Sequence, residues 1–166
     1  MKKKQVLILN QERISYKLRR MAYEIWELNS DEQEIIMIGI ENGGKILADN
    51  LSAILKEISP LKIETIALNI NKKNPINHAL EIDVNLNGKT VVLCDDVINS
   101  GKTIIYSLHA LLSYDLKKIM VAVLVDRKHK SFPISSDIVG HTVATTIQDH
   151  IEVETKGKKI TGVYLE

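Results

Sequence analysis

The stretch that most constrains the fold of this chain is residues 90–103, where an apolar run meets two carboxylates and a short polar loop. Residues 90–94 are mostly apolar and β-branched, which is typical of a strand buried on both faces. Asp95 and Asp96 follow, and a helical apolar pattern begins at about Thr103. In such a strand–loop–helix unit the loop amides and the helix N-terminus point at one spot and favour an anion. The stretch therefore predicts an anion-binding site at the end of a buried strand.

The two aspartates restrict what that anion can be. Residues 100–103 end like a Walker A loop, but that motif needs a glycine five residues before Gly101, where this chain has Asp96. A carboxylate in the mouth of a triphosphate cradle would repel the phosphates. Asp95 and Asp96 must therefore contact something else, such as sugar hydroxyls or a hydrated metal.

The strand–helix arrangement recurs along the chain. Strands are predicted at residues 5–9, 34–40, 61–69, 90–94 and 117–125, helices after Asn10, Gly44 and Thr103, and a C-terminal hairpin over residues 151–165 around Gly157. Alternating strands and helices predict an α/β fold with a mostly parallel central sheet and helices on both faces. The loops at 41–44, 95–103 and 126–130 all follow strand ends, so we expect them to converge at one edge of the sheet.

Bulk composition excludes several classes of protein. A length of 166 residues suggests one domain, 1–166, with a sizeable core. The formal net charge of +1 supplies no global field to recruit nucleic acid or a membrane. The single cysteine, Cys94, lies in the apolar run, so we expect a small core residue rather than a nucleophile. No signal peptide or membrane-length apolar run is visible, so we expect a cytoplasmic protein without membrane contact.

Residues 90–103 resemble the phosphoribosyl-pyrophosphate (PRPP) motif of the type I phosphoribosyltransferases, which has four apolar residues, two acids, two apolar residues and a small polar loop ending Gly-x-Thr. The resemblance implies that family's fold, with a small hood that includes the C-terminal hairpin. It also implies that Asp95 and Asp96 are the catalytic pair, hold the ribose hydroxyls, and meet Mg²⁺ mostly through water or those hydroxyls. Many purine-specific members have, in place of Asn99, an Asp that can serve as a catalytic base. The neutral amide of Asn99 cannot accept a proton in that way. The residues implied to bind the 5-phosphate are Asn99, Ser100, Gly101, Lys102 and Thr103.

Two further segments acquire roles from the same resemblance. Asn42, Gly43 and Gly44 would form the pyrophosphate loop, where Glu41 is unfavourable unless it faces away or meets magnesium. The polar interval at residues 70–88 lies where the family has a mobile loop that closes over PRPP and excludes water. Lys72 and Lys73 in this interval could reach pyrophosphate. The alternative is an ordinary hairpin with solvated lysines.

Residues 122–140 indicate a particular subfamily of the phosphoribosyltransferases. They resemble the bifunctional pyrimidine-operon attenuators that are also uracil phosphoribosyltransferases, through Leu-Val-Asp-Arg-x-His, then a Pro-Ile pair, then Asp-x-Val-Gly. The resemblance implies that Asp126 and Arg127 lie beside the base and that Ile138 or Val139 offers main-chain groups to its edge. The alternative for Asp126 and Arg127 is a local ion pair that shapes the loop.

The implied reaction is displacement of pyrophosphate from PRPP by a nitrogen of a nucleobase, with uracil as the expected base and a homodimer as the expected assembly. The alternative is a nucleotide-sensing, RNA-binding regulator of pyrimidine genes with weak or no transferase activity. That regulator needs a local basic face, because the net charge does not indicate RNA binding. Arg13, Lys17, Arg19 and Arg20 form either an ordinary solvated helix face or a patch for RNA or a partner subunit.

Overall fold

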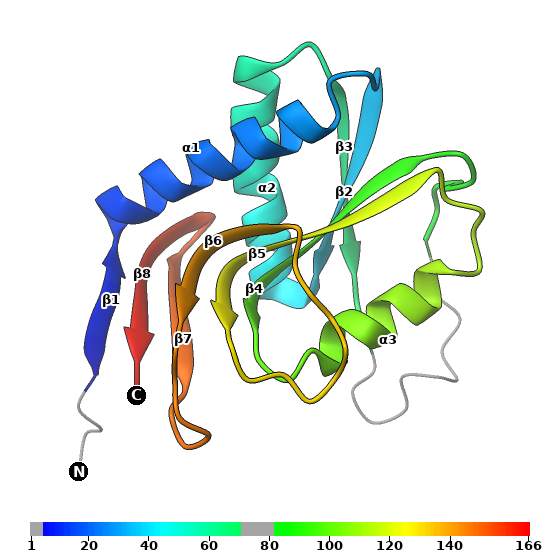
Figure 1. The fold of residues 1–166 in the computed structure, drawn as a ribbon. Coiled ribbons are helices and arrows are strands. Elements are labelled where there is room, and N and C mark those ends of the chain that lie inside the picture. The colour runs from blue at the N-terminus through cyan, green and yellow to red at the C-terminus, as the bar shows by residue number, and fades with distance from the viewer. Residues whose placement is uncertain (1–4, 71–81) are drawn as a thin grey trace.

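The computed structural model describes residues 5–70 and 82–166, which form a central parallel sheet, three helices and a second, small sheet (Figure 1). The central sheet has the strand order β3-β2-β4-β5-β6, with all neighbouring pairs parallel. The elements in chain order are β1 (Val6–Asn10), α1 (Gln11–Leu28), β2 (Glu34–Ile40), α2 (Glu41–Ile58), β3 (Lys62–Leu68), β4 (Thr90–Ile98), α3 (Lys102–Leu111), β5 (Lys118–Arg127), β6 (Ile138–Val143), β7 (Ile151–Lys156) and β8 (Lys159–Leu165).

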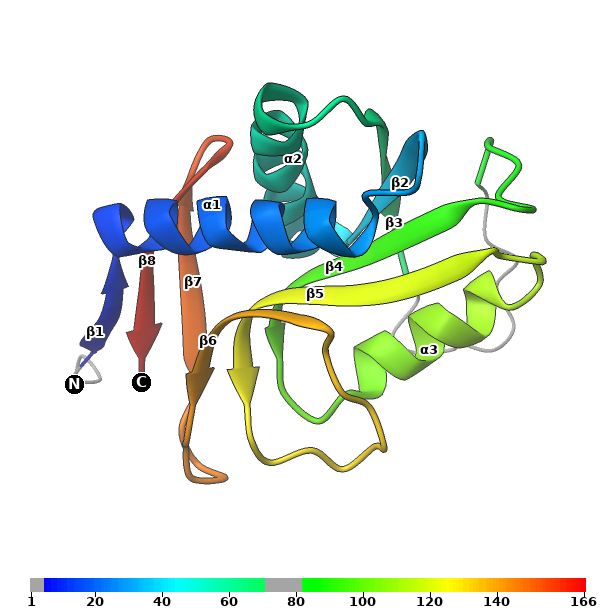
Figure 2. The same cartoon turned by 45° about the horizontal axis from the view of Figure 1, so that its top comes forward.

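The central strands are buried on both faces, as their continuous apolar runs predict. Because side chains alternate along a strand, Val92 and Cys94 of β4 join one core with α1 and α2. Val91 and Leu93 join a second core with α3 on the opposite face. The two views of the ribbon show α1 and α2 on one side of the sheet and α3 on the other (Figures 1 and 2). The predicted α/β architecture with helices on both faces is confirmed.

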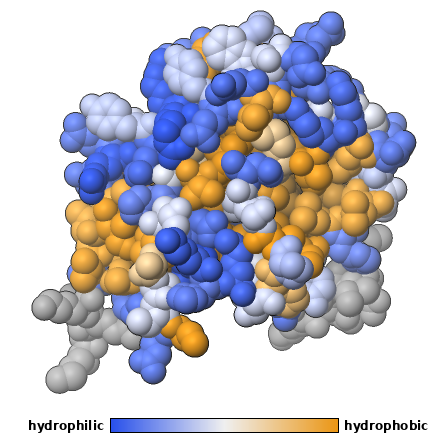
Figure 3. Space-filling view, viewed as in Figure 1, coloured by the Kyte–Doolittle hydropathy of each residue, from blue (hydrophilic) through white to orange (hydrophobic). Residues whose placement is uncertain are grey.

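The small sheet joins the two ends of the chain. β7 and β8 form the antiparallel hairpin predicted around Gly157, and β1 pairs antiparallel with β8, giving the order β1-β8-β7. The sequence predicted the first strand but not its partner. Val6 and Leu7 on this edge strand are each 52% exposed, and apolar residues gather over β1 at the left of the space-filling view (Figure 3).

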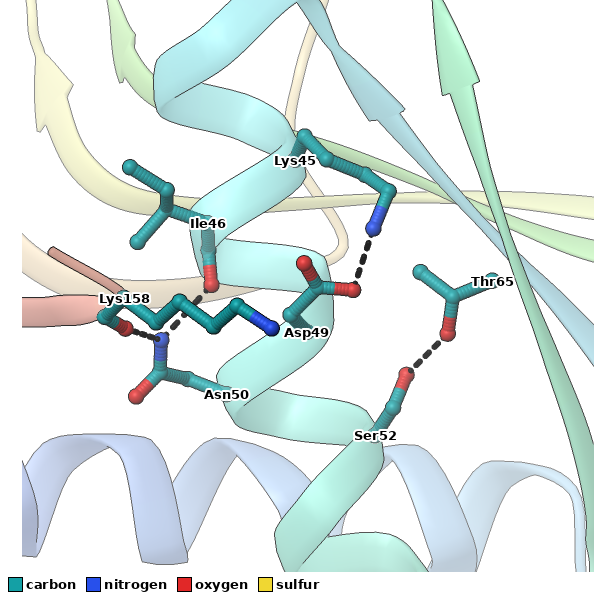
Figure 4. A network of polar contacts seen from close by, with 7 residues as sticks. All are labelled: Lys45, Ile46, Asp49, Asn50, Ser52, Thr65 and Lys158. Carbon is teal, nitrogen blue, oxygen red and sulfur yellow. Dashed lines mark hydrogen bonds and ion pairs between the residues drawn. The ribbon is translucent and has the colours of Figure 1, made fainter.

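A polar network fixes α2 against both sheets (Figure 4). Asn50 Nδ2 donates to the carbonyl of Ile46 on its own helix at 2.7 Å and to the carbonyl of Lys158, in the β7–β8 turn, at 2.9 Å. Ser52 Oγ lies 2.8 Å from Thr65 Oγ1 on β3. These contacts hold α2 in place from the hairpin on one side and from the edge strand on the other, and so they also fix the position of its N-terminus.

Helix α1 begins where the sequence places its cap. The Asn10 side chain accepts a hydrogen bond from the Arg13 amide at 2.9 Å, and Ile14, Leu18 and Met21 are buried beneath the helix. Hydrophilic residues cover its outer side (Figure 3). Among the residues that the structure describes, no helix combines the length and apolar character needed to cross a membrane.

We predict that Asn10→Ala lowers the free energy of unfolding by about 1 kcal/mol, because the first turn of α1 loses its side-chain acceptor. Urea unfolding followed by circular dichroism measures the change. The neighbouring exposed Gln11→Ala is the matched control and should leave the midpoint within error. Equal effects of the two substitutions would contradict the capping role.

Candidate active site

Asp95 and Asp96 lie among the last residues of β4, not beyond its end as the sequence suggested, because the strand continues to Ile98. Asp95 Oδ1 accepts a hydrogen bond from the Asp96 amide at 3.0 Å, and Asp96 Oδ1 accepts one from the Val97 amide at 2.9 Å. These bonds hold both carboxylates close to the backbone at the carboxyl edge of the central sheet. The strand thus presents two fixed acids at the position where parallel sheets bind ligands.

The pKa of the Asp95 carboxyl is raised well above its ordinary range. Burial is the main cause, followed by the negative charge of Asp96 and its hydrogen bond, with a smaller contribution from Glu41. A carboxyl whose pKa is higher in the folded state costs stability once the pH rises through its ordinary range and the group ionises. A cation beside the pair would offset that cost at neutral pH.

The predicted pyrophosphate loop is not a loop. α2 begins at Glu41 directly after β2, so Asn42, Gly43 and Gly44 form the first turn of the helix. Glu41 makes the sharp change of direction with a φ of +51°, in the left-handed region that a side chain rarely adopts. The helix N-cap is Ile40, whose apolar side chain makes no capping hydrogen bond. This part of the prediction is corrected, but the three residues still carry amides at a helix N-terminus.

The two glycines serve to pack α2 onto β4. A Cβ at Gly43 would lie 2.3 Å from Asp96 Oδ2, and a Cβ at Gly44 would lie 2.3 Å from the Cys94 carbonyl oxygen. Only glycine permits this approach, which sets the carboxylate of Asp96 against the positive end of the helix. The sequence suggested that the glycines let a ligand approach the backbone, whereas in the structure they let α2 approach Cys94 and Asp96 of β4.

Residues 99–101 form a tight connection between β4 and α3, and Lys102 and Thr103 are the first residues of the helix. Gly101 is the N-cap of α3 with a φ of +86°, and it has no side chain with which to cap the helix. The turn encloses a small cavity of about 40 Å³ that Asp95 also lines, with the turn residues Asn99, Ser100, Gly101, Lys102 and Thr103. The amides of Ser131 and Phe132 both donate to the Ser100 carbonyl at 3.0 Å and so support the turn from behind. The predicted phosphate segment is therefore a preformed concave turn at a helix N-terminus.

Asp126 and Arg127 end β5 and do not pair with one another, so their reading as a local ion pair is wrong. Asp126 is buried and pairs with Lys130, whose Nζ lies 2.8 Å from its Oδ1. Arg127 instead donates to Asn99 Oδ1 at 2.8 Å, to Thr145 Oγ1 at 2.7 Å and to the Thr146 carbonyl at 2.9 Å. Arg127 thus connects the turn after β4 to the loop after β6.

The structure contradicts the base-binding role predicted for Ile138 and Val139. Both belong to the amino-terminal half of β6, where Ile138 pairs with Ala122 and Val139 with Val123, several residues before the carboxyl edge. Ile138 is buried in the core, and the Val139 carbonyl accepts a hydrogen bond from Arg20 of α1 at 2.9 Å. Neither residue faces the cavities at the site.

The sequence reasoning missed the loop after β6. This loop lines a cavity of about 840 Å³ with Thr146, Ile147 and Gln148. The Ile147 residue is 94% exposed to solvent. The sequence analysis predicted no strand at β6 (Ile138–Val143), so it could not place the loop that follows at the same edge of the sheet. The other lining residues are Asn99, Ser100, Arg127, His129, Lys130 and Ser131.

The predicted mobile loop carries Lys72 and Lys73, which lie outside the described residues. Its flanking strands, β3 and β4, lie on opposite sides of β2 and are parallel to it. Both readings of the interval, a closing loop and an ordinary hairpin, fall mainly on residues outside the described ones. The role of the two lysines at pyrophosphate stays a prediction.

The magnesium prediction rests on the acidic pair. No group of three or more histidine, cysteine or acidic side chains with metal-site spacing occurs within residues 5–70 and 82–166. A pair of carboxylates close to a third acid is a donor set that suits a hard cation retaining several water ligands. Asp95 and Asp96 thus fit Mg²⁺ held with few protein ligands.

Two helix N-termini whose N-cap residues provide no side-chain cap flank two acids at the carboxyl edge of a parallel sheet, an arrangement that favours an anionic ligand. A model of the phosphoribosyl transferase domain matches residues 6–156. The chain belongs to the phosphoribosyltransferase family, and it is accordingly a transferase.

Relatives named "Bifunctional protein PyrR" match nearly the whole chain. The protein from Haemophilus ducreyi is 31% identical over 160 residues, covering 90% of this chain and 89% of the relative. The protein from Fusobacterium nucleatum is 33% identical, covering 94% of both chains. The protein from Alkaliphilus metalliredigens is 36% identical, covering 90% and 88%. These relatives confirm the subfamily predicted from residues 122–140.

Solved structures show the same fold. The hypoxanthine-guanine phosphoribosyltransferase of Bacillus anthracis superposes with a TM-score of 0.73 at 20% identity, covering 83% of this chain and 82% of that one. The hypoxanthine phosphoribosyltransferase of Trypanosoma cruzi gives 0.80 at 14% identity, covering 96% and 97%. At these identities the likeness concerns the fold alone.

We predict that Gly43→Ala lowers transferase activity about a hundredfold, because the new Cβ displaces the Asp96 carboxylate from its position. Initial rates of pyrophosphate release measure the loss. Gly157→Ala is the control: a Cβ at Gly157 meets open space, and the residue lies in the distant hairpin turn, where its φ is +61°. That substitution should lower stability by about 1 kcal/mol without changing the rate per folded molecule. Full activity of Gly43→Ala would contradict the proposed contact.

Proposed function

We propose that this chain transfers the 5-phosphoribosyl group of PRPP to a nucleobase, with uracil as the expected base, and releases pyrophosphate. The observation that carries the proposal is the position of Asp95 and Asp96. Asp95 lines the small cavity at the N-terminus of α3, and Asp96 lies against the first turn of α2. The acidic pair therefore lies between two anion-favouring helix ends, which suits a molecule with hydroxyls in its centre and phosphates at both ends.

The shape of the protein supports a proposed place for each end of PRPP. The 5-phosphate would occupy the concave turn, where its oxygens meet the amides of Asn99 to Thr103 and the N-terminus of α3. The pyrophosphate would lie at the first turn of α2, at Asn42, Gly43 and Gly44. The ribose hydroxyls would face Asp95 and Asp96. The base would enter the larger cavity beside Arg127 and the loop that carries Thr146, Ile147 and Gln148.

Mg²⁺ would be held by Asp95 and Asp96, mostly through water and the ribose hydroxyls. When bound there, it would neutralise charge on the departing pyrophosphate. The carboxylates themselves orient the hydroxyls and so fix the sugar relative to the base.

The protein has little covalent chemistry to perform in this reaction. The bond between the anomeric carbon and pyrophosphate breaks, a bond to the base nitrogen forms, and the nitrogen loses its proton. The sugar passes through an oxocarbenium-like state, so the main tasks of the chain are to position both substrates and to stabilise the leaving anion. Fixed helix amides suit the second task, because they require no reorganisation as negative charge develops.

The decisive test is a panel of nucleobases assayed with PRPP and Mg²⁺. We predict pyrophosphate release that requires both a base and the metal, with uracil the best substrate. Replacing Asp95 and Asp96 together with Asn should reduce the rate by about a hundredfold or more, since the ribose hydroxyls lose the carboxyl groups that orient them. Asp115→Asn, at an exposed position after α3, is the control and should keep full activity. Full turnover by the double variant would reject the site assignment.

A second function, RNA binding, is favoured by a specific cluster of cations. Arg13, Lys17 and Arg20 lie on one part of α1, with His141 of β6 beside them. Arg20 is also paired with Glu24, so Arg13 and Lys17 are the cations proposed to meet RNA. Burial lowers the pKa of Lys17, and the charges of Arg20 and Arg13 lower it further. Burial likewise lowers the pKa of His141, followed by the charges of Lys17 and Arg13. Crowded positive charge on one face of a nearly neutral chain suits a polyanion such as RNA.

We predict that the chain binds a pyrimidine-gene leader RNA with a steep dependence on salt. Replacing Arg13 and Lys17 together with Gln should weaken binding and reduce the slope of log K against log salt by about 2 if each cation meets one phosphate. Transferase activity should not change. Lys62→Gln, an exposed lysine on β3, is the control. Weak binding without salt dependence would leave the chain an enzyme alone. Assembly as a homodimer and a cytoplasmic location stay predictions.

A further inference from the structure

Asn99 occupies the junction between the two cavities of the site. It lines the small cavity formed by the turn before α3, and it also lines the large cavity with Arg127 and Ile147. If the turn holds the 5-phosphate and the large cavity holds the base, the new bond between sugar and base forms next to this side chain. Asn99 is exposed, so its amide can reach a ligand.

Arg127 fixes the polarity of the Asn99 amide. Arg127 Nη1 lies 2.8 Å from Asn99 Oδ1. A guanidinium has five N–H donors and no acceptor, so only the amide oxygen can face it. The amide oxygen of Asn99 must therefore face Arg127, and its NH₂ group must face away from it.

Arg127 is itself held in one orientation. Its Nε donates to Thr145 Oγ1 at 2.7 Å and its Nη2 donates to the Thr146 carbonyl at 2.9 Å. These two bonds use the other edges of the guanidinium fork, so rotation of Arg127 would break three contacts at once. The Asn99 oxygen is thus engaged with a rigid partner, and the amide has its NH₂ group left for a ligand.

We propose that Asn99 is a specificity-determining residue that donates a hydrogen bond to an acceptor on the base, next to the nitrogen that reacts. The inference rests on the proposed function and refines the part of the site that meets the base. In uracil the reacting N1 is flanked by the 2-carbonyl oxygen, which is such an acceptor. A carboxylate in place of Asn99 would present an acceptor and repel that oxygen, and would suit a base that carries an N–H at the corresponding position.

The test compares uracil with 4(3H)-pyrimidinone, which keeps the ring but lacks the 2-carbonyl. The analogue is measured as a substrate, or as a competitive inhibitor of uracil if it does not turn over. The quantity of interest is the uracil-to-analogue ratio in each variant divided by the ratio in the unmodified chain, because the intrinsic reactivity of the two bases then cancels. We expect this ratio to fall about tenfold in Asn99→Ala, as one neutral hydrogen bond is lost.

Two further variants test the polarity and its cause. Asn99→Asp should lower the ratio more than Asn99→Ala does, because a second oxygen would face the carbonyl. Arg127→Met should lower it less, because the amide is still present but free to rotate. Urea unfolding of each variant shows that it is folded under assay conditions.

The outcomes separate this inference from the function on which it rests. If the unmodified chain releases no pyrophosphate with any base, the proposed function fails. If it turns over uracil but the Asn99 variants reduce both bases equally, transfer stands and the donor role of Asn99 is wrong. An Asp variant that keeps the ratio of the unmodified chain would also overturn it.

Discussion

The close approach of the first turn of α2 to the end of β4 is the contact on which the site depends. It requires glycine at positions 43 and 44, because a Cβ at either would lie 2.3 Å from an oxygen of β4. The result is a helix N-terminus facing the carboxylate of Asp96, with no capping side chain from Ile40. The arrangement is held from a distance by Asn50 and Ser52, which tie the other turns of α2 to the β7–β8 turn and to β3 (Figure 4). The packing of α2 on β4 thereby fixes the position of the helix N-terminus relative to the Asp96 carboxylate.

The sequence predicts the central sheet well because burial on both faces leaves a simple signature. A strand such as β4 needs apolar side chains in both directions, and its run of Val and Leu is continuous for that reason. The Asn10 cap of α1 and the hairpin around Gly157 are equally local and appear where expected. The pairing of β1 with β8 was not predictable in the same way, because its partners are separated by nearly the whole chain and no local pattern encodes their register.

The site shows the same division between local and non-local information. The carboxylates and the turn after β4 follow from a contiguous motif and lie together as predicted. The roles of Arg127 and of the loop after β6 depend on the order of strands in the sheet, which brings the ends of β4, β5 and β6 side by side. Ile138 and Val139 were misassigned because the motif at residues 122–140 ends before the loop after β6, whereas the strand pairing places both residues several positions short of the edge.

Acidic and basic side chains are concentrated on different parts of the molecule, which the net charge does not reveal. At the carboxyl edge, burial and then the charges of Asp96 and Glu41 raise the pKa of Asp95. On α1, burial and then the charges of Arg20 and Arg13 lower the pKa of Lys17. A net charge of +1 therefore hides two opposed local fields. In the proposed function, a phosphorylated sugar would approach this acidic edge because backbone amides at two helix ends, together with a divalent cation, would supply the positive charge that Asp95 and Asp96 do not. This explains how one motif can place acids and phosphates within a single site.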